Sequence, residues 1–288
     1  LVDDAQAIVE SDKASAELKA AAQKYLDTLN DGDANSVASK ALVAEAAKVA
    51  DVCDTCKDIV ENKEYLSKKS VWIFGGDGWA YDIGFGGVDH VLASGEDVNI
   101  MVFDTEVYSN TGGQASKASQ IGQVAQFAAA GKAIAKKSLA EIAMSYGYVY
   151  VAQIAMGADM NQTLKAIQEA EAYPGPSLII GYAPCEMHSI KGGMTNCQAE
   201  MKKAVDCGYW NMFRYNPALK AQGKNPFTVD SKPATADYKE FIMNEARYSS
   251  LMRANPERAN ALFEQAAENS KARYDHIMRL KALYEVEE

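Results

Sequence analysis

Ser70-Val71-Trp72-Ile73-Phe74-Gly75 is the stretch that decides the fold, because it is a short β-prone run that ends in glycines. A buried strand of a parallel sheet commonly has this form, a continuous apolar run bounded by a turn signal. Similar runs follow at residues 98–104, 149–154 and 177–182. Helical patterns lie between the runs, at residues 79–94, 120–145 and 159–173. This alternation predicts right-handed βαβ units, and so an α/β fold with a mostly parallel sheet and helices on both of its faces.

The flanks of this α/β region have helical patterns. Residues 1–68 are rich in Ala, Lys, Asp and Glu, and a turn at Asn30-Asp31-Gly32-Asp33 separates a first helical stretch from a second one at residues 37–60. Further helical stretches are predicted at residues 236–252 and 256–283. We therefore expect a helical segment, 1–68, and an α/β domain with a C-terminal helical extension, 69–288. Because the chain begins at Leu1 within a helical pattern, we expect it to be a piece of a longer protein.

Composition narrows the class of protein. A chain of 288 residues with 48% hydrophobic and 24% charged residues can bury a substantial core. The net charge of −10 argues against a nucleic-acid-binding protein, which needs a basic surface. No apolar run is long enough to cross a bilayer and no signal peptide is visible, so we expect a cytoplasmic protein without membrane contact. Five cysteines without regular spacing favour reduced thiols or a metal cluster over a disulfide framework.

A glycine-rich segment, Gly75-Gly76-Asp77-Gly78-Trp79-Ala80, stands at the end of the first predicted strand. Ligands of parallel sheets gather at the carboxyl ends of the strands, where helix N-termini offer N–H groups to anions. Glycines let the backbone approach a diphosphate, but Asp77 would repel phosphates unless a cation lay between them. Asp77 therefore predicts a divalent metal such as Mg²⁺, with further oxygen ligands in the polar loop at residues 104–114 after the next strand.

Two other phosphate-binding motifs fit this segment less well. The Rossmann pattern G-x-G-x-x-G is incomplete, because Gly76 and Gly78 are followed by Ala80 and Tyr81. The G-K-[ST] of a phosphate-binding P-loop is missing. A tight strand–helix turn without any ligand stays open at this point.

Gly76-Asp77-Gly78, with the polar loop that contains Asn110 one strand further on, resembles the motif by which thiamine-diphosphate enzymes bind Mg²⁺ and the diphosphate. Longer strings resemble the pyruvate:ferredoxin oxidoreductases in particular. They include Gly-Gly-Asp-Gly-Trp-Ala-Tyr-Asp-Ile-Gly-Phe-Gly-Gly at residues 75–87, and residues 104–114, 143–153, 173–180 and 190–194. The match runs from about residue 72 to the C-terminus, so the chain is identified as similar to the C-terminal, thiamine-diphosphate-binding domain of such an enzyme.

The resemblance implies roles for individual residues. It makes Asp77 a Mg²⁺ ligand, with Thr105 through its hydroxyl and Val107 through its carbonyl, and it gives Asn110 a second role at the substrate. Around the diphosphate or the thiazolium ring it places Gly76, Gly78, Trp79, Tyr108, Ser109 and Asn110. Ordinary aromatic packing is the alternative for Trp79 and Tyr108. Glu106 is expected to be a solvated or helix-facing carboxylate.

The resemblance also singles out one cysteine. In the family a Tyr-Ala-Pro-Cys segment carries one ligand of a [4Fe–4S] cluster, and Tyr182-Ala183-Pro184-Cys185 matches it. The family's other cluster cysteines lie in segments that this chain lacks. Cys53 and Cys56 have a spacing that can hold a metal, but they lie in a helical pattern without glycine. Cys207 is expected to be a buried apolar residue, and His188 is either structural or close to the cofactor.

The family's chemistry is the oxidative decarboxylation of pyruvate to acetyl-CoA and CO₂, with thiamine diphosphate as an electron sink and iron–sulfur clusters that carry electrons to ferredoxin. The implied partners are pyruvate, coenzyme A, ferredoxin and the remaining domains of the enzyme, which is commonly a homodimer. The carboxylate that activates the cofactor comes from another domain, so the active site of this chain alone is expected to be incomplete. Two alternatives stay open: a different 2-oxoacid substrate, or a non-catalytic interaction module whose terminal helices bind partners.

Overall fold

The computed structural model describes residues 1–285, which form two compact units that divide between Ser70 and Val71. The first unit, residues 1–70, consists of four helices and a short 3₁₀ helix. They are α1 (Val2–Glu10), α2 (Ala16–Leu26), α3 (Gly32–Ala46), α4 (Asp54–Glu61) and η1 (Lys63–Tyr65). The second helical stretch expected from the sequence is therefore two helices. Ser15 and Asp31 cap α2 and α3 by accepting backbone N–H groups, which stops each helix from extending backwards.

The second unit contains a six-stranded sheet in the order β1-β2-β6-β5-β7-β8. The strands predicted from the apolar runs are all present and mutually parallel: β1 (Trp72–Gly76), β2 (Asn99–Asp104), β5 (Tyr150–Ile154) and β6 (Ser177–Tyr182). Two short antiparallel strands, β7 (Phe213–Tyr215) and β8 (Phe227–Val229), extend the sheet and were not predicted. A separate hairpin pairs β3 (Val107–Tyr108) with β4 (Gln114–Ala115).

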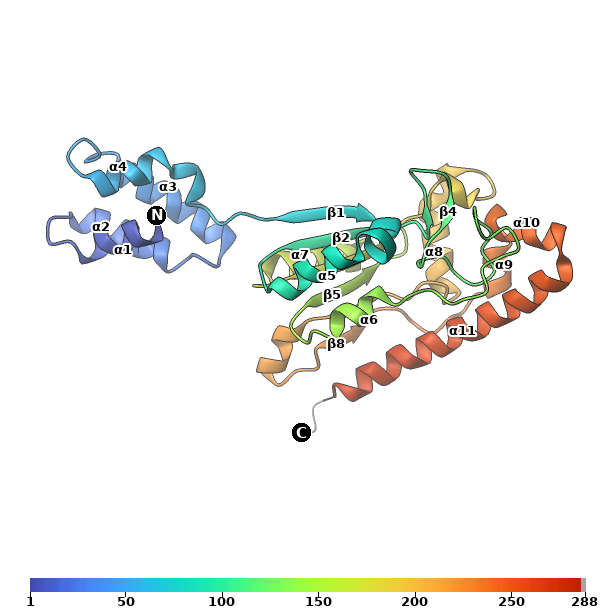
Figure 1. Ribbon diagram of the computed structural model, residues 1–288. Coiled ribbons are helices and arrows are strands. Elements are labelled where there is room, and N and C mark those ends of the chain that lie inside the picture. Colours follow the sequence, from blue (N-terminus) through green and yellow to red (C-terminus); the bar gives the residue numbers. More distant parts are fainter. Residues whose placement is uncertain (286–288) are drawn as a thin grey trace. The chain divides into compact units, whose positions relative to one another are not determined.

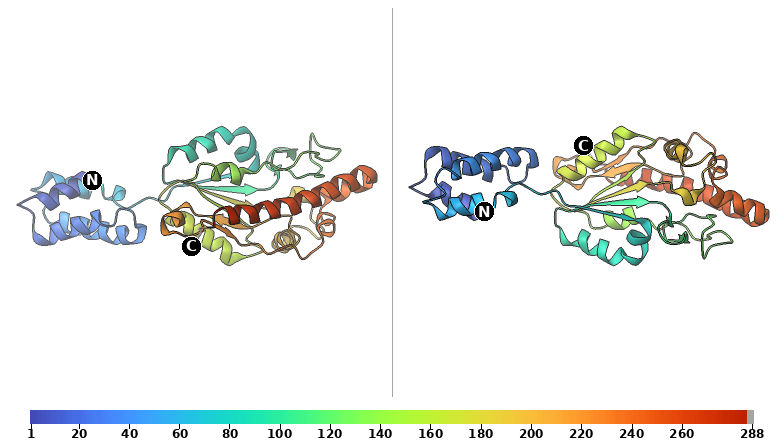
Figure 2. Two further views of the ribbon diagram at one scale, coloured as in Figure 1. Left: turned by 90° about the horizontal axis from the view of Figure 1, so that it is seen from below. Right: turned by 90° about the horizontal axis from the view of Figure 1, so that it is seen from above.

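Helices cover both faces of this sheet, as Figure 2 shows for the second unit. On one face lie α5 (Phe85–Ser94) and α6 (Leu139–Met144), and on the other lies α7 (Met160–Ala172). The alternation of side chains along β2 explains the two layers, because Ile100 and Val102 join the core that contains α5 and α6, whereas Met101 joins the core beneath α7. The predicted α/β class is confirmed.

The rest of the second unit is mostly C-terminal helices and short turns. These elements are η2, a π-helix (Gly78–Ile83), η3 (Glu186–His188), η4 (Met194–Asn196), α8 (Cys197–Asp206), η5 (Pro217–Gln222), α9 (Tyr238–Ile242), α10 (Ala246–Ala254) and α11 (Pro256–Leu283). The prediction of a long helix at residues 256–283 is confirmed. The helix predicted at 236–252 is instead broken between α9 and α10, where Glu245 bridges to Ile190.

The helix predicted at residues 120–145 was wrong for most of its length, because α6 alone is helical there. Gly122 and Gly131 adopt positive φ angles of 81° and 77°, which interrupt a helix. Both glycines also lie against neighbouring helices: a Cβ at Gly131 would come within 2.6 Å of Leu251, and one at Gly122 within 2.9 Å of Phe263. The small-residue composition that suggested a helix therefore serves close packing of a loop.

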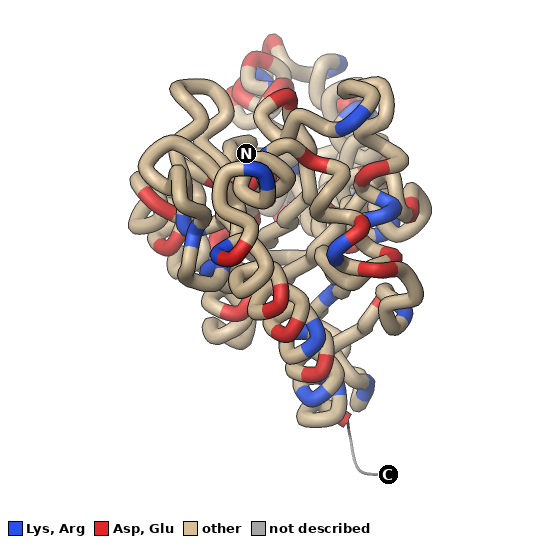
Figure 3. Tube along the Cα trace, turned by 90° about the vertical axis from the view of Figure 1, so that its right-hand side faces the viewer, with Lys and Arg blue, Asp and Glu red and all other residues tan. Residues whose placement is uncertain are grey.

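Charged residues of both signs are interspersed over the face in Figure 3. Within residues 1–285, none of the helices combines the length and the apolar character that a membrane span needs.

The features that position a candidate site lie at the carboxyl ends of β1 and β2. These two strands are parallel neighbours, so their following segments begin at the same edge of the sheet (Figure 1).

Candidate functional site

Asp77 lies at the carboxyl end of β1, immediately before the π-helix η2, and its side chain is buried. Two hydroxyl groups donate to its carboxylate. Thr105 Oγ1 lies 2.7 Å from Asp77 Oδ1, and Ser116 Oγ lies 2.6 Å from Oδ2. Burial raises the pKa of Asp77 above its ordinary value, and the two hydroxyl donors oppose that rise. The result is a buried carboxylate that a nearby cation would stabilise in its charged form.

Three kinds of oxygen atom meet at Thr105. Its hydroxyl lies 2.7 Å from the Asp77 carboxylate, 2.9 Å from the carbonyl oxygen of Val107 and 3.5 Å from the Ser109 hydroxyl. One hydroxyl proton cannot serve the carboxylate and the carbonyl together. A carboxylate, a hydroxyl and a carbonyl are oxygen ligands of the kind that Mg²⁺ accepts. The structure thus brings together Asp77, Thr105 and Val107, and their donor set fits a hard divalent cation.

Ser116 belongs to this cluster, although the sequence did not single it out. It follows β4 and is buried, and besides its bond to Asp77 its Oγ accepts the N–H of Ala118 at 3.0 Å. Its position two residues after Gln114, near the end of the polar loop, was the available signal. A serine next to a loop is common, and the decisive contact spans 39 residues of sequence.

The glycines after β1 have different surroundings. A Cβ at Gly76 would meet no atom within 4 Å, so its backbone is open to a ligand. A Cβ at Gly78 would come within 2.6 Å of the Tyr108 ring, so glycine is needed for this aromatic contact. Trp79 packs against Gly75 and Gly84, where added Cβ atoms would lie 2.2 Å and 2.1 Å from its ring.

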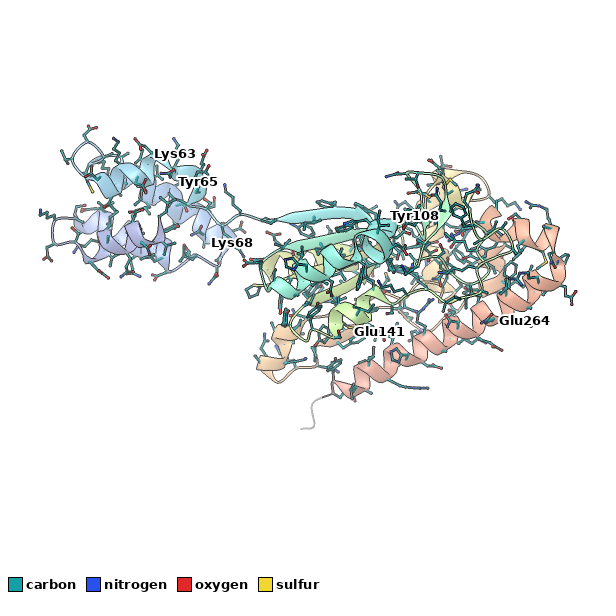
Figure 4. The ribbon with its side chains drawn as sticks, in the orientation of Figure 1. Lys63, Tyr65, Lys68, Tyr108, Glu141 and Glu264 are labelled. Carbon is teal, nitrogen blue, oxygen red and sulfur yellow. The ribbon has the colours of Figure 1, made fainter. Side chains whose placement is uncertain are left out.

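The β3–β4 hairpin carries the remaining predicted site residues. Tyr108 lies past the carboxyl ends of β1 and β2, in the loop region of Figure 4. Ser109 is partly buried and Asn110 is exposed, at the turn of the β3–β4 hairpin. Gly113 closes this turn with a φ of 70°, a conformation that favours glycine. The hairpin therefore presents Asn110 outward, whereas the Thr105 hydroxyl, which precedes the hairpin, points to the Asp77 carboxylate.

The expectation for Glu106 was wrong, because its side chain is completely buried. Its carboxylate forms ion pairs with Arg247 (2.9 Å) and Lys136 (3.3 Å), and it accepts hydrogen bonds from Gln120 (3.1 Å) and Tyr209. Burial acts to raise the pKa of Glu106, but the two cations and the Tyr209 hydroxyl outweigh it and lower this pKa to about 2. Glu106 is thus a charged group held inside the protein, between Thr105 and Val107 in the chain.

Asp104 forms the other half of this buried charge cluster. Lys136 lies 2.7 Å from its carboxylate, and the Tyr81 hydroxyl donates to it at 2.7 Å. Burial raises the pKa of Asp104 to about 6, with Lys136 opposing the rise and the charges of Asp77 and Glu106 adding to it. Lys136 therefore neutralises acidic residues that follow β2.

Cys185 lies after β6, at the start of η3, and is partly buried. Burial raises the pKa of its thiol, while backbone N–H groups of Met187 and His188 oppose this. His188, at the end of the same turn, is fully buried, and burial lowers its pKa to about 3. The neutral ring therefore donates through Nε2 to the carbonyl oxygen of Thr105, 2.9 Å away. The turn with Cys185 is in this way connected to the segment that carries Thr105 and Val107.

Two of the other cysteines, Cys53 and Cys56, belong to the first unit, and Cys207 follows α8 in the second. Cys53 caps α4, where its sulfur accepts the N–H of Cys56 at 3.3 Å, and Cys56 is buried. Burial and the neighbouring Cys53 raise the pKa of Cys56 to about 12. Cys207 is buried, as expected. Within residues 1–285 no group of three or more His, Cys, Asp or Glu side chains is arranged to hold a metal.

Comparison with known proteins gives a consistent result. Residues 39–180 match the family described as thiamine pyrophosphate enzyme, C-terminal TPP binding domain. The pyruvate:ferredoxin oxidoreductase of Moorella thermoacetica is 54% identical over 271 residues, which cover 92% of this chain and 23% of that protein. The pyruvate-flavodoxin oxidoreductase of Klebsiella pneumoniae is 50% identical over 266 residues, again 92% of this chain and 23% of that protein. The mitochondrial pyruvate dehydrogenase [NADP(+)] of Euglena gracilis is 46% identical over 257 residues, or 89% and 14%. The chain thus spans less than a quarter of the length of these relatives.

Proposed function

This chain belongs, as a thiamine pyrophosphate-binding domain, to the family of the pyruvate:ferredoxin and pyruvate-flavodoxin oxidoreductases, and from that premise we propose that it binds the diphosphate and Mg²⁺ of thiamine diphosphate (thiamine pyrophosphate). The observation that carries the proposal is the meeting of carboxylate, hydroxyl and carbonyl oxygens around Thr105 Oγ1. Asp77, Thr105 and Val107 would hold the cation. The open backbone at Gly76 and the residues Gly78, Trp79, Tyr108, Ser109 and Asn110 would surround the cofactor.

The reaction of the whole enzyme is proposed to be the oxidative decarboxylation of pyruvate, yielding acetyl-CoA, CO₂ and reduced ferredoxin. When bound, thiamine diphosphate supplies an electron sink for the departure of CO₂. The relatives support pyruvate more firmly than the acceptor, since their names share pyruvate but differ among ferredoxin, flavodoxin and NADP(+). Asn110, exposed at the hairpin turn, is the residue of this chain that we propose to contact the substrate.

Other parts of the proposal concern the intact enzyme. Cys185 would supply one ligand of a [4Fe–4S] cluster, with the other ligands from segments outside this chain. The remaining domains, coenzyme A, ferredoxin, a homodimeric assembly and a cytoplasmic location are proposed from the same family membership. Neither a different 2-oxoacid nor a non-catalytic interaction module is favoured, since the relatives named above are pyruvate enzymes and the oxygen cluster at Asp77 suits a cation.

Metal removal tests the proposed site. We expect calorimetry to show heat when thiamine diphosphate is added to the chain with Mg²⁺, and no heat after treatment with EDTA, because Asp77, Thr105 and Val107 would hold the cation that neutralises the diphosphate. Inorganic pyrophosphate with Mg²⁺ should compete with the cofactor, since it carries the same diphosphate group. Equal heat with and without EDTA would refute the metal-bridged site and favour the interaction module.

A second test concerns the completeness of the active site. We expect the purified chain, saturated with thiamine diphosphate and Mg²⁺, to show no pyruvate-dependent reduction of a viologen dye. The reason is that the carboxylate needed to activate the cofactor is not among the residues assigned here. Measurable reduction of the dye by the chain alone would contradict the proposal that its active site is incomplete.

A further inference from the structure

Two of the proposed metal ligands, Thr105 and Val107, are separated in the chain by a single residue whose backbone conformation is unusual. Glu106, between Thr105 and Val107, has a φ of 60°, a left-handed conformation that residues with a side chain rarely adopt. In an extended strand, successive residues point to opposite sides. The left-handed turn at Glu106 instead lets the Thr105 hydroxyl and the Val107 carbonyl oxygen approach each other to 2.9 Å.

Hydrogen bonds hold the backbone N–H and carbonyl groups of this turn. The N–H of Glu106 donates to the Asp104 carboxylate at 3.2 Å. Its carbonyl oxygen accepts from Ser119 Oγ at 2.6 Å and from Gln123 Nε2 at 3.0 Å. The carbonyl oxygen of Thr105 accepts from His188 at 2.9 Å. The strained conformation therefore persists because its surroundings determine it.

The side chain of Glu106 points away from the metal ligands, into the protein. Its partners there, Arg247, Lys136, Gln120 and Tyr209, come from the irregular loop after β4 and from the segments around α8 and α10. Since the carboxylate is anchored to the body of the second unit, its Cα has little freedom to rotate. Glu106 is thus close to the site without being a ligand.

We propose that Glu106 is a positioning residue, whose buried carboxylate holds the left-handed turn that directs Thr105 Oγ1 and the Val107 carbonyl oxygen toward one cation. This inference rests on the proposed function, because it assumes that Asp77, Thr105 and Val107 bind Mg²⁺. It predicts an effect on the geometry of the site, which distinguishes it from a general contribution of a buried charge to folding.

The test measures metal affinity on the full 288-residue chain with thiamine diphosphate present. Mn²⁺ is the probe, followed by electron paramagnetic resonance, and Mg²⁺ and Ca²⁺ are measured by competition. For Glu106→Gln we expect about a tenfold or larger loss of Mg²⁺ affinity, the usual effect of removing a group that orients a metal ligand. Ca²⁺ affinity should fall less, because Ca²⁺ tolerates irregular coordination better than Mg²⁺ does.

The matched control is Glu200→Gln. Glu200 is an equally buried carboxylate, paired with Lys203 and hydrogen-bonded to Asn244. Neither of these contacts involves a residue of the segment 104–110. We expect it to leave both metal affinities unchanged. Glu106→Gly adds a second control: glycine adopts the left-handed turn without strain but lacks the anchor, so it should also lose Mg²⁺ affinity. If Glu106→Gln does not fold, Gln120→Ala replaces it, because this variant removes one hydrogen bond to the Glu106 carboxylate and should cause a smaller loss in the same direction.

The outcomes separate the two proposals. If wild type and Asp77→Asn bind Mn²⁺ equally, the proposed site fails, and the role of Glu106 fails with it. If Asp77→Asn weakens binding but Glu106→Gln and Glu106→Gly bind as wild type does, the role of Glu106 alone is overturned. An equal loss of Mg²⁺ and Ca²⁺ affinity in Glu106→Gln would likewise overturn it, because that pattern indicates a general loss of structure.

Discussion

Asp77→Asn is expected to weaken the Mg²⁺-dependent binding of thiamine diphosphate on the order of a hundredfold, because the proposed metal site would lose its carboxylate ligand. The amide oxygen of asparagine can still accept a hydrogen bond from the hydroxyl of Thr105 or of Ser116, but the amide group carries no charge. The remaining ligands, a hydroxyl and a carbonyl, are neutral. Calorimetric titration of the chain with thiamine diphosphate at a fixed Mg²⁺ concentration measures the change.

The same substitution should cost little folding stability. Burial already raises the pKa of Asp77, so the charged carboxylate is a disfavoured group when no cation is present. We expect the free energy of unfolding in EDTA to stay within about 1 kcal/mol of wild type, the scale of one hydrogen bond.

Asp89→Asn is the control for this prediction. It makes the same chemical change on α5, where Asp89 accepts a hydrogen bond from Tyr146 at 2.6 Å. Cofactor binding by this variant should equal that of wild type. Comparable weakening in both variants would show that the loss does not come from the proposed ligand.

Arg247→Ala is expected to lower the free energy of unfolding of the second unit by about 3 to 5 kcal/mol, the range for removing one partner of a buried ion pair. The guanidinium is almost completely buried and pairs with Glu245 at 2.6 Å and with Glu106 at 2.9 Å. Its loss leaves two carboxylates in the interior without this counter-charge. Burial already raises the pKa of Glu245 to about 7, so the loss should be smaller at pH 6, where Glu245 takes up a proton, than at pH 8.

Urea unfolding followed by tryptophan fluorescence measures this effect, because Trp72, Trp79 and Trp210 are the three tryptophans of the chain and all belong to the second unit. Arg214→Ala is the matched control. Arg214 pairs with Glu169 and Asp230, whose carboxylates are partly exposed and can be solvated after the arginine is removed. An Arg247→Ala loss no larger than that of Arg214→Ala would contradict the role assigned to the buried pair.

The parts of the fold that were predictable are those with a local signal. Each parallel strand lies in a mostly apolar run bounded by turn signals, and such a run can be recognised without tertiary information. The same reasoning predicted that Asp77 would meet polar groups of the loop at residues 104–114, since both follow strands and the carboxyl ends of parallel strands meet at one edge of the sheet. The choice of Thr105 within that loop came from the family resemblance. Strands β7 and β8 were not predicted because each has only three residues, too few for a recognisable apolar pattern.

The misreadings have a common cause. The loop at residues 121–137 has the small and apolar residues of a helix, and its actual conformation depends on contacts of Gly122 and Gly131 with α10 and α11. Likewise, Glu106 stands among polar residues and looks solvated in the sequence, but the groups that bury it are distant along the chain. In both cases distant contacts outweigh local preference.

The sequence by itself determined the class of fold and the residue types of the proposed Mg²⁺ site, because apolar periodicity, glycines after a strand and an acidic residue among them are local features. The family followed from longer motifs that resemble those of the pyruvate:ferredoxin oxidoreductases. Only the tertiary structure decided which groups surround that site. Ser116 reaches the Asp77 carboxylate, His188 reaches the Thr105 carbonyl, and Arg247 and Lys136 hold the Glu106 carboxylate across long intervals of chain. The physical reason is that a buried polar group needs a hydrogen-bond or charge partner. That partner can come from any part of the chain that folding brings close, so its identity does not follow from neighbouring residues in the sequence.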